Sequence, residues 1–538
     1  MDSKSRNYFL NLTVFILIFL FSLFALSNIG FILGLSINPF YLLISFFISL
    51  FYLFKTKNSV SKPLILLFIF LIFFISFIFS NFFIDTSFDG RCYHFTLENL
   101  FKLGFNPFYD DIKTFANENN IFYNLLFASS YPNALEVLRA NFYLIFQNME
   151  SSKIINFLFG FCSFFYSFHF FLNKLDKFKS LILSLCILLC AVSICQINTK
   201  MADFALYYLF ILQLFSILLI NKKQNLKSNI FILVSSSVLA IALKYIGLLN
   251  TVLIFCIWLI FKRKKDILKI ILLTTILSAI LCAQPYINNT IKFKNPFYPS
   301  IGHNKLDFMT KQNPKEFKNK PYLYKFFRSM FSSSSDARMN NPQTPRLYYK
   351  IPFTSHFDMP YGAEDIRING FGHLFSGIFI ISIILSLISL FKKRGSFVIC
   401  AILLTVLLNP ICWWARFVPQ LHLLPIINCY YFRKNKIIFF LLSALIIANG
   451  LWVAKENFAT NAYKTYVMNN FYNNIYEKTK NKPIDVYIDK TPHDEDDSTI
   501  LFRMNEYGIK YILNDIANED FKEIKTDCTI TNSYKIRY

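Results

Sequence analysis

The stretch "LILLFIFLIFFISFIFSNFFI" occupies residues 64–84 and contains no charged residue. An α-helix rises 1.5 Å per residue, so about 20 apolar residues cross the hydrocarbon core of a bilayer. This stretch therefore predicts a transmembrane helix. In the whole chain of 538 residues, 55% are hydrophobic and only 16% are charged. Such a composition indicates a membrane protein rather than a soluble domain.

Further apolar stretches on both sides of residues 64–84 extend this prediction. We expect a multi-spanning α-helical membrane protein with about 13 transmembrane helices. The predicted spans lie near residues 8–27, 34–54, 64–84, 152–172, 180–197, 204–220, 229–247, 249–261, 268–286, 372–391, 396–411, 417–432 and 437–454.

The Lys and Arg residues alternate between the connections of these spans. Every second short connection is basic, whereas the intervening short ones carry almost no Lys or Arg. This pattern predicts a multi-pass protein of the cytoplasmic (inner) membrane, with a cytoplasmic N-terminus and an extracytoplasmic C-terminus. It also accounts for most of the formal charge of +23, so we expect no nucleic-acid partner. The basic connections are residues 55–62, 174–179, 222–227, 262–269, 392–394 and 433–436.

Two long loops fall on the outer side of the predicted membrane domain, which covers residues 1–454. The loop at 85–151 contains two amphipathic stretches, which predict helices on the membrane surface or ordinary packed loop helices. The loop at 287–371 is basic, and its residues 303–350 are rich in Ser, Asn and Pro. They are typical either of a mobile cover over an anionic lipid head group or of a solvated loop.

The tail at 455–538 differs in composition from the rest of the chain. Alternating apolar residues predict strands at 485–489, 511–515 and 533–538, with a short helix at 498–508. We therefore expect a small extracytoplasmic α/β domain.

Charged residues gather at the outer ends of the predicted spans. Such groups are costly beside a bilayer, so they are candidates for function. For single residues there are simpler explanations: Lys200 and Lys244 could extend toward the interface, and Trp413 and Trp414 could form an aromatic belt. The clustering on one side favours a site at the outer surface. Its members are Asp85, Asp89, Lys200, Asp203, Lys244 and Arg416.

The stretch "FDGRCYHF" (88–95) resembles an Asp-x-x-x-Tyr-His pattern in the first outer loop of bacterial GT-C glycosyltransferases, relatives of protein O-mannosyltransferases and lipid A aminoarabinose transferases. The chain departs from the family pattern at Phe88, His373 and Phe417, where Trp, Pro and Tyr are common. Further similar stretches follow in order at 106–110, 130–138, 200–209, 242–248, 295–302, 369–375 and 415–425.

The resemblance implies a GT-C-like fold and a specific reaction. A sugar would move, with inversion, from a polyprenyl-phosphate donor to a glycan, lipid or protein acceptor at the outer face, among membrane lipids. Asp89 would be the general base and Arg416 the first choice for the donor phosphate. The residues expected to bind substrate are Tyr93, His94, Lys200, Asp203, Lys244 and Arg416.

Two alternatives stay open. Asp110 and Asp111 have the oxygen ligands that a divalent cation prefers, but paired acids are also typical of a solvated loop, so no metal site is predicted. The second alternative is a transporter or flippase of lipid-linked glycans. It would favour broken helices and polar residues at mid-membrane.

Overall fold

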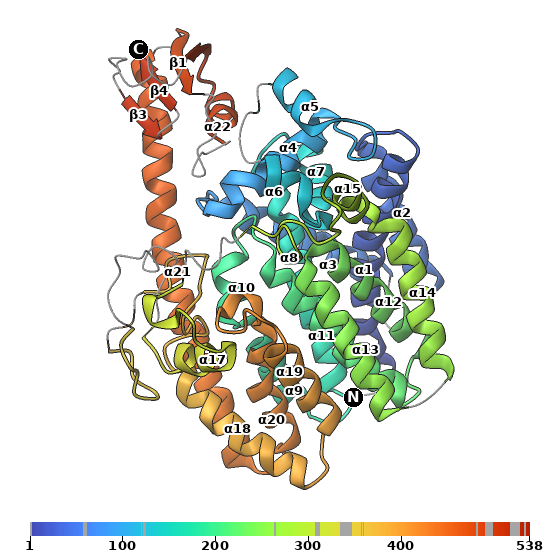
Figure 1. The fold of residues 1–538 in the computed structure, drawn as a ribbon. Helices are drawn as coiled ribbons and strands as arrows, with labels where there is room; N and C mark the ends of the chain where they lie inside the picture. Colours follow the sequence, from blue (N-terminus) through green and yellow to red (C-terminus); the bar gives the residue numbers. More distant parts are fainter. Residues whose placement is uncertain are drawn as a thin grey trace.

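The computed structural model describes residues 3–56, 62–119, 121, 125–262, 265–306, 313–333, 347–356, 358, 360–479, 482–489, 499–516, 528–531 and 534–537. Most of this chain is helical (Figure 1). The α-helices of the first half are α1 (Ser3–Ile32), α2 (Pro39–Lys55), α3 (Lys62–Phe82), α4 (Phe95–Leu103), α5 (Ile112–Glu118), α6 (Leu125–Ser130), α7 (Ala134–Phe146), α8 (Ile154–Phe171), α9 (Lys177–Leu188), α10 (Ala191–Gln196), α11 (Asp203–Asn221) and α12 (Leu226–Leu243).

The second half continues with α13 (Tyr245–Phe261), α14 (Lys265–Leu281), α15 (Ala283–Phe293), α17 (Tyr322–Met330), α18 (Phe375–Phe391), α19 (Ser396–Leu407), α20 (Leu423–Tyr431), α21 (Lys436–Thr479) and α22 (Ile500–Glu506). The strands are β1 (Ile484–Asp489), β2 (Tyr511–Ile516), β3 (Cys528–Thr531) and β4 (Tyr534–Arg537). Short turns of helix are η1 (Gly90–His94), η2 (Ser151–Lys153), η3 (Lys315–Phe317), η5 (Ala415–Phe417) and η6 (Pro419–His422).

Within the described residues, six helices are long and apolar enough to cross a membrane. The bent pair α14 and α15, which meet at 64°, would add a seventh span if counted as one. Four shorter apolar helices, α2, α13, α18 and α19, accompany them. The structure thus supports a helical membrane protein, while thirteen spans stay a prediction. The six helices span Asn7–Ile32, Pro63–Phe82, Ser151–Phe171, Asp203–Asn221, Leu226–Leu243 and Lys436–Thr479.

Several predicted spans are interrupted in the structure. The span expected at 229–247 ends with α12 at Leu243, and α13 begins at Tyr245 after an extended residue, Lys244. The chain can turn back closely here because Gly247 has no Cβ. A Cβ at this position would collide with the carbonyl oxygen of Ala240. The break places Lys244 at the junction of two helices rather than within a span.

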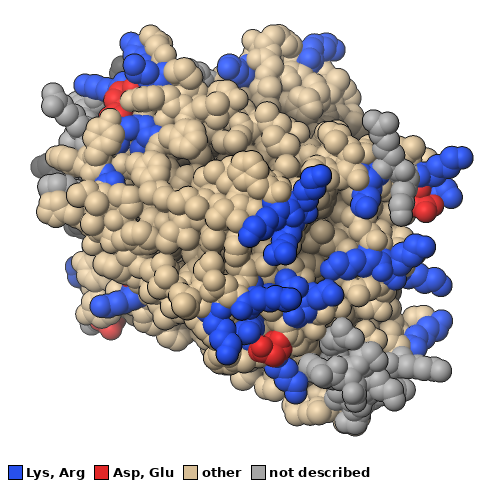
Figure 2. All heavy atoms as spheres, turned by 90° about the horizontal axis from the view of Figure 1, so that it is seen from below, with Lys and Arg blue, Asp and Glu red and all other residues tan. Residues whose placement is uncertain are grey.

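The described parts of the basic connections share one end of the helical bundle (Figure 1). The N-terminus lies at the lower end in Figure 1, and the chain then alternates in direction through the bundle. Seen from below, that end carries many Lys and Arg side chains and few Asp or Glu (Figure 2). The cytoplasmic position of this face remains a prediction from its charge.

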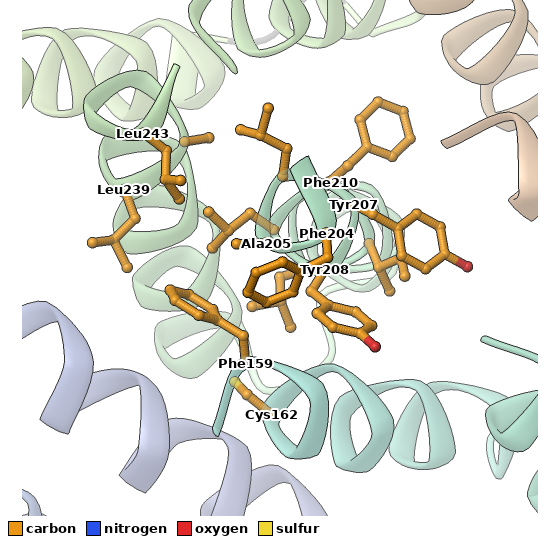
Figure 3. Packing of buried hydrophobic residues seen from close by; sticks show 14 of the residues in the cluster. Phe159, Cys162, Phe204, Ala205, Tyr207, Tyr208, Phe210, Leu239 and Leu243 are labelled. Atoms are coloured by element: carbon orange, nitrogen blue, oxygen red, sulfur yellow. The ribbon is translucent and has the colours of Figure 1, made fainter. Parts of the chain in front are cut away.

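Helix α11 lies at the centre of the apolar core. Phe204, Tyr207 and Tyr208 of this helix are at most 1% exposed. They pack among side chains of α8 and α12, including Phe159 and Leu239 (Figure 3). Asp203, the first residue of α11, is therefore fixed by a fully packed helix.

The tail contains a four-stranded sheet in the order β2-β1-β4-β3. β1 pairs in parallel with β2 and antiparallel with β4, and β3 pairs antiparallel with β4. These elements coincide with the strands and helix predicted there, and β3 is additional. The expected domain boundary at residue 454 falls inside α21, which extends beyond the bundle toward the sheet (Figure 1). The division into two domains stays a prediction.

Candidate functional site

A π-helical turn, η1, carries the Asp-x-x-x-Tyr-His stretch. The N–H of Phe95 donates to the carbonyl of Gly90, five residues earlier. Asp89 immediately precedes this turn and lies within electrostatic range of Tyr93 and His94. Such turns are frequent at functional sites. Gly90 is required here, since a Cβ would collide with the side chains of Ser87 and Asp85.

Arg416 of η5 joins the acids of this site. Its Nη1 lies 3.0 Å from Asp89 Oδ2 and 3.1 Å from Asp365 Oδ1, and its Nε lies 3.9 Å from Asp203 Oδ2. Lys244 forms an ion pair with the other oxygen of Asp203. The structure thus brings together four predicted residues, Asp89, Asp203, Lys244 and Arg416.

The charges of the central pair stabilise each other. Burial alone would raise the pKa of Asp89, but Arg416, His94 and Lys244 lower it below its ordinary value. Burial alone would lower the pKa of Arg416, but the carboxylates around it, Asp365 first, raise that pKa well above its ordinary value. Both side chains are therefore ionised at neutral pH.

The sequence did not single out three further members of this cluster. Arg367 donates to Asp365 at 2.5 Å and lies over the ring of Trp414, with its guanidinium carbon 4.0 Å from the ring centroid. Gln196 donates to Asp203 Oδ2 at 3.2 Å. Asp365 is one of six acidic residues in the loop at 287–371, so composition alone does not single it out.

Aromatic rings lie beside Asp89. Tyr93 contacts Phe127 and Tyr131, with ring centroids 5.6 and 5.8 Å apart, and all three side chains are partly exposed. Burial and the nearby charge of Asp89 raise the pKa of Tyr93, so its hydroxyl stays protonated. His94, behind Tyr93, pairs with Glu136 of α7.

Lys200 does not join this site. Its ammonium donates to both oxygens of Glu98 at 2.8 and 2.9 Å, to the carbonyl of Met149 and to Ser152 Oγ. It is 1% exposed, so it does not extend toward the interface as one alternative proposed. Asp85 lies in the same buried cluster, where its Oδ2 accepts from the backbone N–H of Lys200 at 2.7 Å. Both residues thus support the outer loop, and substrate binding by Lys200 stays a prediction.

The tail reaches this supporting cluster. Arg503 of α22 donates to Glu150 Oε1 at 2.8 Å and to the carbonyl of Asp85 at 3.0 Å. The neighbouring Phe502 contacts Phe95 with ring centroids 5.4 Å apart. Sequence patterns do not predict this contact, because more than 400 positions separate Arg503 from Asp85.

The residues considered for a metal have other partners. Asp110 accepts from the N–H of Asn106 at 2.7 Å, and Asp111 caps α5 by accepting from the N–H of Thr114 at 3.1 Å. In the part of the chain that the structure describes, no group of three or more His, Cys, Asp or Glu side chains is arranged to hold a metal ion.

The predicted mobile cover at 303–350 falls partly outside the described residues, which omit 307–312 and 334–346.

The two tryptophans before Arg416 are inside the protein. Trp413 and Trp414 are 7% and 1% exposed, so they do not form a lipid-facing belt. Trp414 stacks on Phe417 with ring centroids 5.4 Å apart. The stacked rings of Trp414 and Phe417 thus support η5, the short turn that carries Arg416.

An apolar cavity of about 520 Å³ lies between α12, α13, α14 and α15. Its lining includes Leu248, Phe255, Ile271 and Tyr286. A series of aromatic contacts leads from this cavity toward the charged cluster. The ring centroids of Tyr286 and Tyr245 are 5.6 Å apart, and those of Tyr245 and Tyr131 are 6.1 Å apart.

We compared the chain with known proteins. No family model, no curated protein and no solved structure matches it.

Proposed function

We propose that this protein is a membrane glycosyltransferase that moves a sugar, with inversion, from a polyprenyl-phosphate donor to an acceptor at the outer face. The observation that carries this proposal is the partly buried contact of Asp89 with Arg416, next to Lys244 and Asp203. Such a reaction needs a base for the acceptor hydroxyl and cations for the leaving phosphate. The cluster contains both.

Asp89 is the general base in this proposal, and Arg416 binds the donor phosphate. Arg416 Nε is buried and has no hydrogen-bond partner among the described residues. A phosphate oxygen would satisfy this N–H, and the planar guanidinium suits two phosphate oxygens at once. Lys244 would supply a second positive charge, since its ammonium is partly exposed beside Asp203.

The apolar cavity would hold the first isoprene units of the donor. Its lining is almost entirely apolar, and aromatic contacts through Tyr245 and Tyr131 lead from it to Tyr93. Tyr93, Phe127 and Tyr131 would then pack against the sugar. This arrangement supports a substrate with an apolar chain, a phosphate and a sugar in that order.

The placement of the charges supports an extracytoplasmic site. Asp203 begins α11, whose other end leads to a basic connection, and Lys244 follows α12, which begins after that same connection. The cluster therefore lies at the end of the bundle opposite the basic face. We place that basic face in the cytoplasm and the C-terminus outside.

One observation favours the alternative of a transporter or flippase. The bend of 64° between α14 and α15 resembles the broken helices of transporters. The charged cluster itself lies at one end of the bundle, which favours chemistry at one face.

The test compares a deletion strain with its parent. We expect the deletion to accumulate one polyprenyl-phosphate sugar and to lack one sugar residue in a surface glycan. Purified protein in liposomes should release polyprenyl phosphate from that lipid when an extract of the deletion strain supplies the acceptor. Donor that crosses the bilayer without cleavage would instead establish the flippase.

A further inference from the structure

Helix α22 of the tail makes contacts on two sides. Ile500 and Met504, which are four positions apart and so share one helix face, belong to the apolar core of the tail. The neighbouring side chains of Phe502 and Arg503 instead contact the loop at 85–151. The helix thus lies between the tail and the top of the bundle (Figure 1). It connects the tail to the part of the chain that carries the candidate base.

Arg503 holds the chain just before the turn that carries Asp89. Its Nη2 donates to the carbonyl oxygen of Asp85 at 3.0 Å and to Glu150 Oε1 at 2.8 Å. The carboxylate of Glu150 in turn accepts from the backbone N–H of Asp85 at 3.2 Å. Arg503 is 1% exposed and Asp85 is 2% exposed. Both polar atoms of the Asp85 backbone are thus fixed by hydrogen bonds with buried, charged side chains.

A short series of hydrogen bonds leads from Asp85 to the backbone of Asp89. Asp85 Oδ1 accepts from the N–H of Ser87 at 2.8 Å. The Oγ of Ser87 accepts from the N–H of Gly90 at 3.2 Å, and its carbonyl oxygen accepts from the N–H of Arg91 at 3.0 Å. The N–H of Gly90 belongs to the peptide bond that directly follows Asp89. The position of Asp85 therefore restricts the position of the backbone that carries the candidate base.

Phe502 contacts the residue directly after the same turn. The centroid of its ring lies 5.4 Å from that of Phe95, and the two rings meet at 68°. Phe95 is fully buried, and its N–H closes the π-turn by donating to the carbonyl of Gly90. Two adjacent residues of α22 thus hold the chain on both sides of η1.

We infer that the tail of the proposed transferase positions its general base, with Arg503 and Phe502 holding the turn that carries Asp89. This inference rests on the proposed function and gives the tail a part in it. Arg503 is here a positioning residue, because it acts on Asp89 through the backbone and not on the substrate. A misplacement of about 1 Å can lower the rate of a catalysed reaction about 10²-fold. Support at both ends of η1 therefore bears on kcat, whereas contacts that only attach the tail would not.

The experiment compares Arg503→Met with the wild type, as full chains in lipid nanodiscs. The donor is the polyprenyl-phosphate sugar purified from the deletion strain. Met is apolar and unbranched and donates no hydrogen bond. We expect kcat for the release of polyprenyl phosphate to fall about 10- to 10²-fold. The KM for the donor should not rise, because Arg416 and Lys244 lie on other elements.

A second measurement on the same proteins does not depend on activity. Hydrogen exchange of the backbone amides at 87–95 reports how firmly the turn is held. We expect faster exchange there in Arg503→Met, because the hydrogen bond to the carbonyl of Asp85 is lost.

Glu506→Ala is the matched control. Glu506 lies three positions after Arg503 in α22, and its Oε1 accepts from the N–H of Met149 at 2.6 Å. The substitution also removes a contact between the tail and the loop at 85–151, but not one with Asp85. We expect kcat, and exchange at 87–95, to stay close to those of the wild type.

The outcomes separate this inference from the proposed function. An unchanged kcat in Arg503→Met, with or without faster exchange, would overturn the inference and leave the transferase intact. Equal losses of kcat in Arg503→Met and Glu506→Ala would also overturn it. A wild type that releases no polyprenyl phosphate would overturn the proposed function, and the exchange data would still decide whether the tail holds the turn. If Arg503→Met does not fold, Phe502→Ala decides, because unchanged kcat and exchange in that variant would overturn the inference.

Discussion

Replacement of Asp89 by Asn separates a catalytic carboxylate from one that only binds Arg416. The side chain is 16% exposed, and its Oδ2 lies 3.0 Å from Arg416 Nη1. Asn keeps the shape and one acceptor oxygen but cannot take a proton. Asp89 occupies the N-cap position of η1, yet its side chain makes no capping hydrogen bond. Loss of a helix cap therefore does not contribute.

Asp365→Asn is a close control, because Asp365 is also 16% exposed and its Oδ1 lies 3.1 Å from the same nitrogen. Asp89→Asn removes the charge from one hydrogen bond with Arg416, worth about 1.5–3 kcal/mol of folding free energy. Asp365→Asn removes the charge from the ion pair with Arg416 and from the hydrogen bonds that Arg367 donates. Arg416 keeps the other two carboxylates in both variants, so the larger cost of a stranded buried charge does not arise. We expect the melting temperature of purified Asp365→Asn to decrease at least as much as that of Asp89→Asn.

The catalytic effects should differ. Loss of a general base lowers kcat about 10²–10⁴-fold, which corresponds to roughly 3–5 kcal/mol of activation free energy. We expect this loss in Asp89→Asn and a much smaller one in Asp365→Asn, measured as polyprenyl phosphate released in a single turnover. Equal losses in the two variants would refute Asp89 as the base and leave it as one of several partners of Arg416.

Three further predictions follow from the structure. Arg416→Lys keeps the charge but removes the buried Nε donor and the bidentate geometry. The KM for the donor should therefore rise about tenfold or more. A KM close to that of the wild type would exclude Arg416 from phosphate binding. Burial alone would raise the pKa of Glu150, but Lys153, Arg503 and Lys200 lower it to about 2. The pKa of Glu150 is lower in the folded state than in the unfolded state. Its ionised carboxylate therefore stabilises the fold at pH values above about 4.5, and this stabilisation is lost as the pH falls toward 2. The melting temperature should decrease over that range, less so in Glu150→Gln. A reporter that is active only outside the membrane should be active when fused after Tyr538, and activity of the same reporter near residue 58 would reverse the topology.

The helical framework could be predicted because its signal is local. The apolar run at 64–84 corresponds to α3, and the charges at one end of the predicted spans correspond to a real cluster. Charged residues that are all predicted at the outer ends of spans can contact one another. This is why Asp89, Lys244 and Arg416 could be predicted to share one site. Local patterns do not identify long-range partners. Lys200 looked like the other span-end charges because its partner Glu98 lies 102 positions away.

Long-range pairing also explains what was missed within the site. Glu136 is 42 positions from His94 and sits in an amphipathic helix, where a carboxylate is ordinarily solvated. Asp365 reaches Arg416 from a long loop whose composition is basic. The break at Lys244 depends on close packing of Gly247 against α12, which hydropathy does not report.

In the proposed transferase, the charge balance of the site would link donor binding to activation of the base. Asp89, Asp203 and Asp365 are matched by Lys244, Arg367 and Arg416, so the cluster is neutral without substrate. A donor phosphate adds negative charge and competes with the carboxylates for Arg416. Asp365 keeps Arg367 as a partner, whereas the ion pair with Arg416 is the only one that Asp89 makes among the described residues. A phosphate that displaces Asp89 from Arg416 therefore frees the carboxylate and moves its pKa upward, because the attraction that lowered the pKa is weakened. In the proposed transferase, Asp89 would therefore be a stronger base with the donor bound than without it.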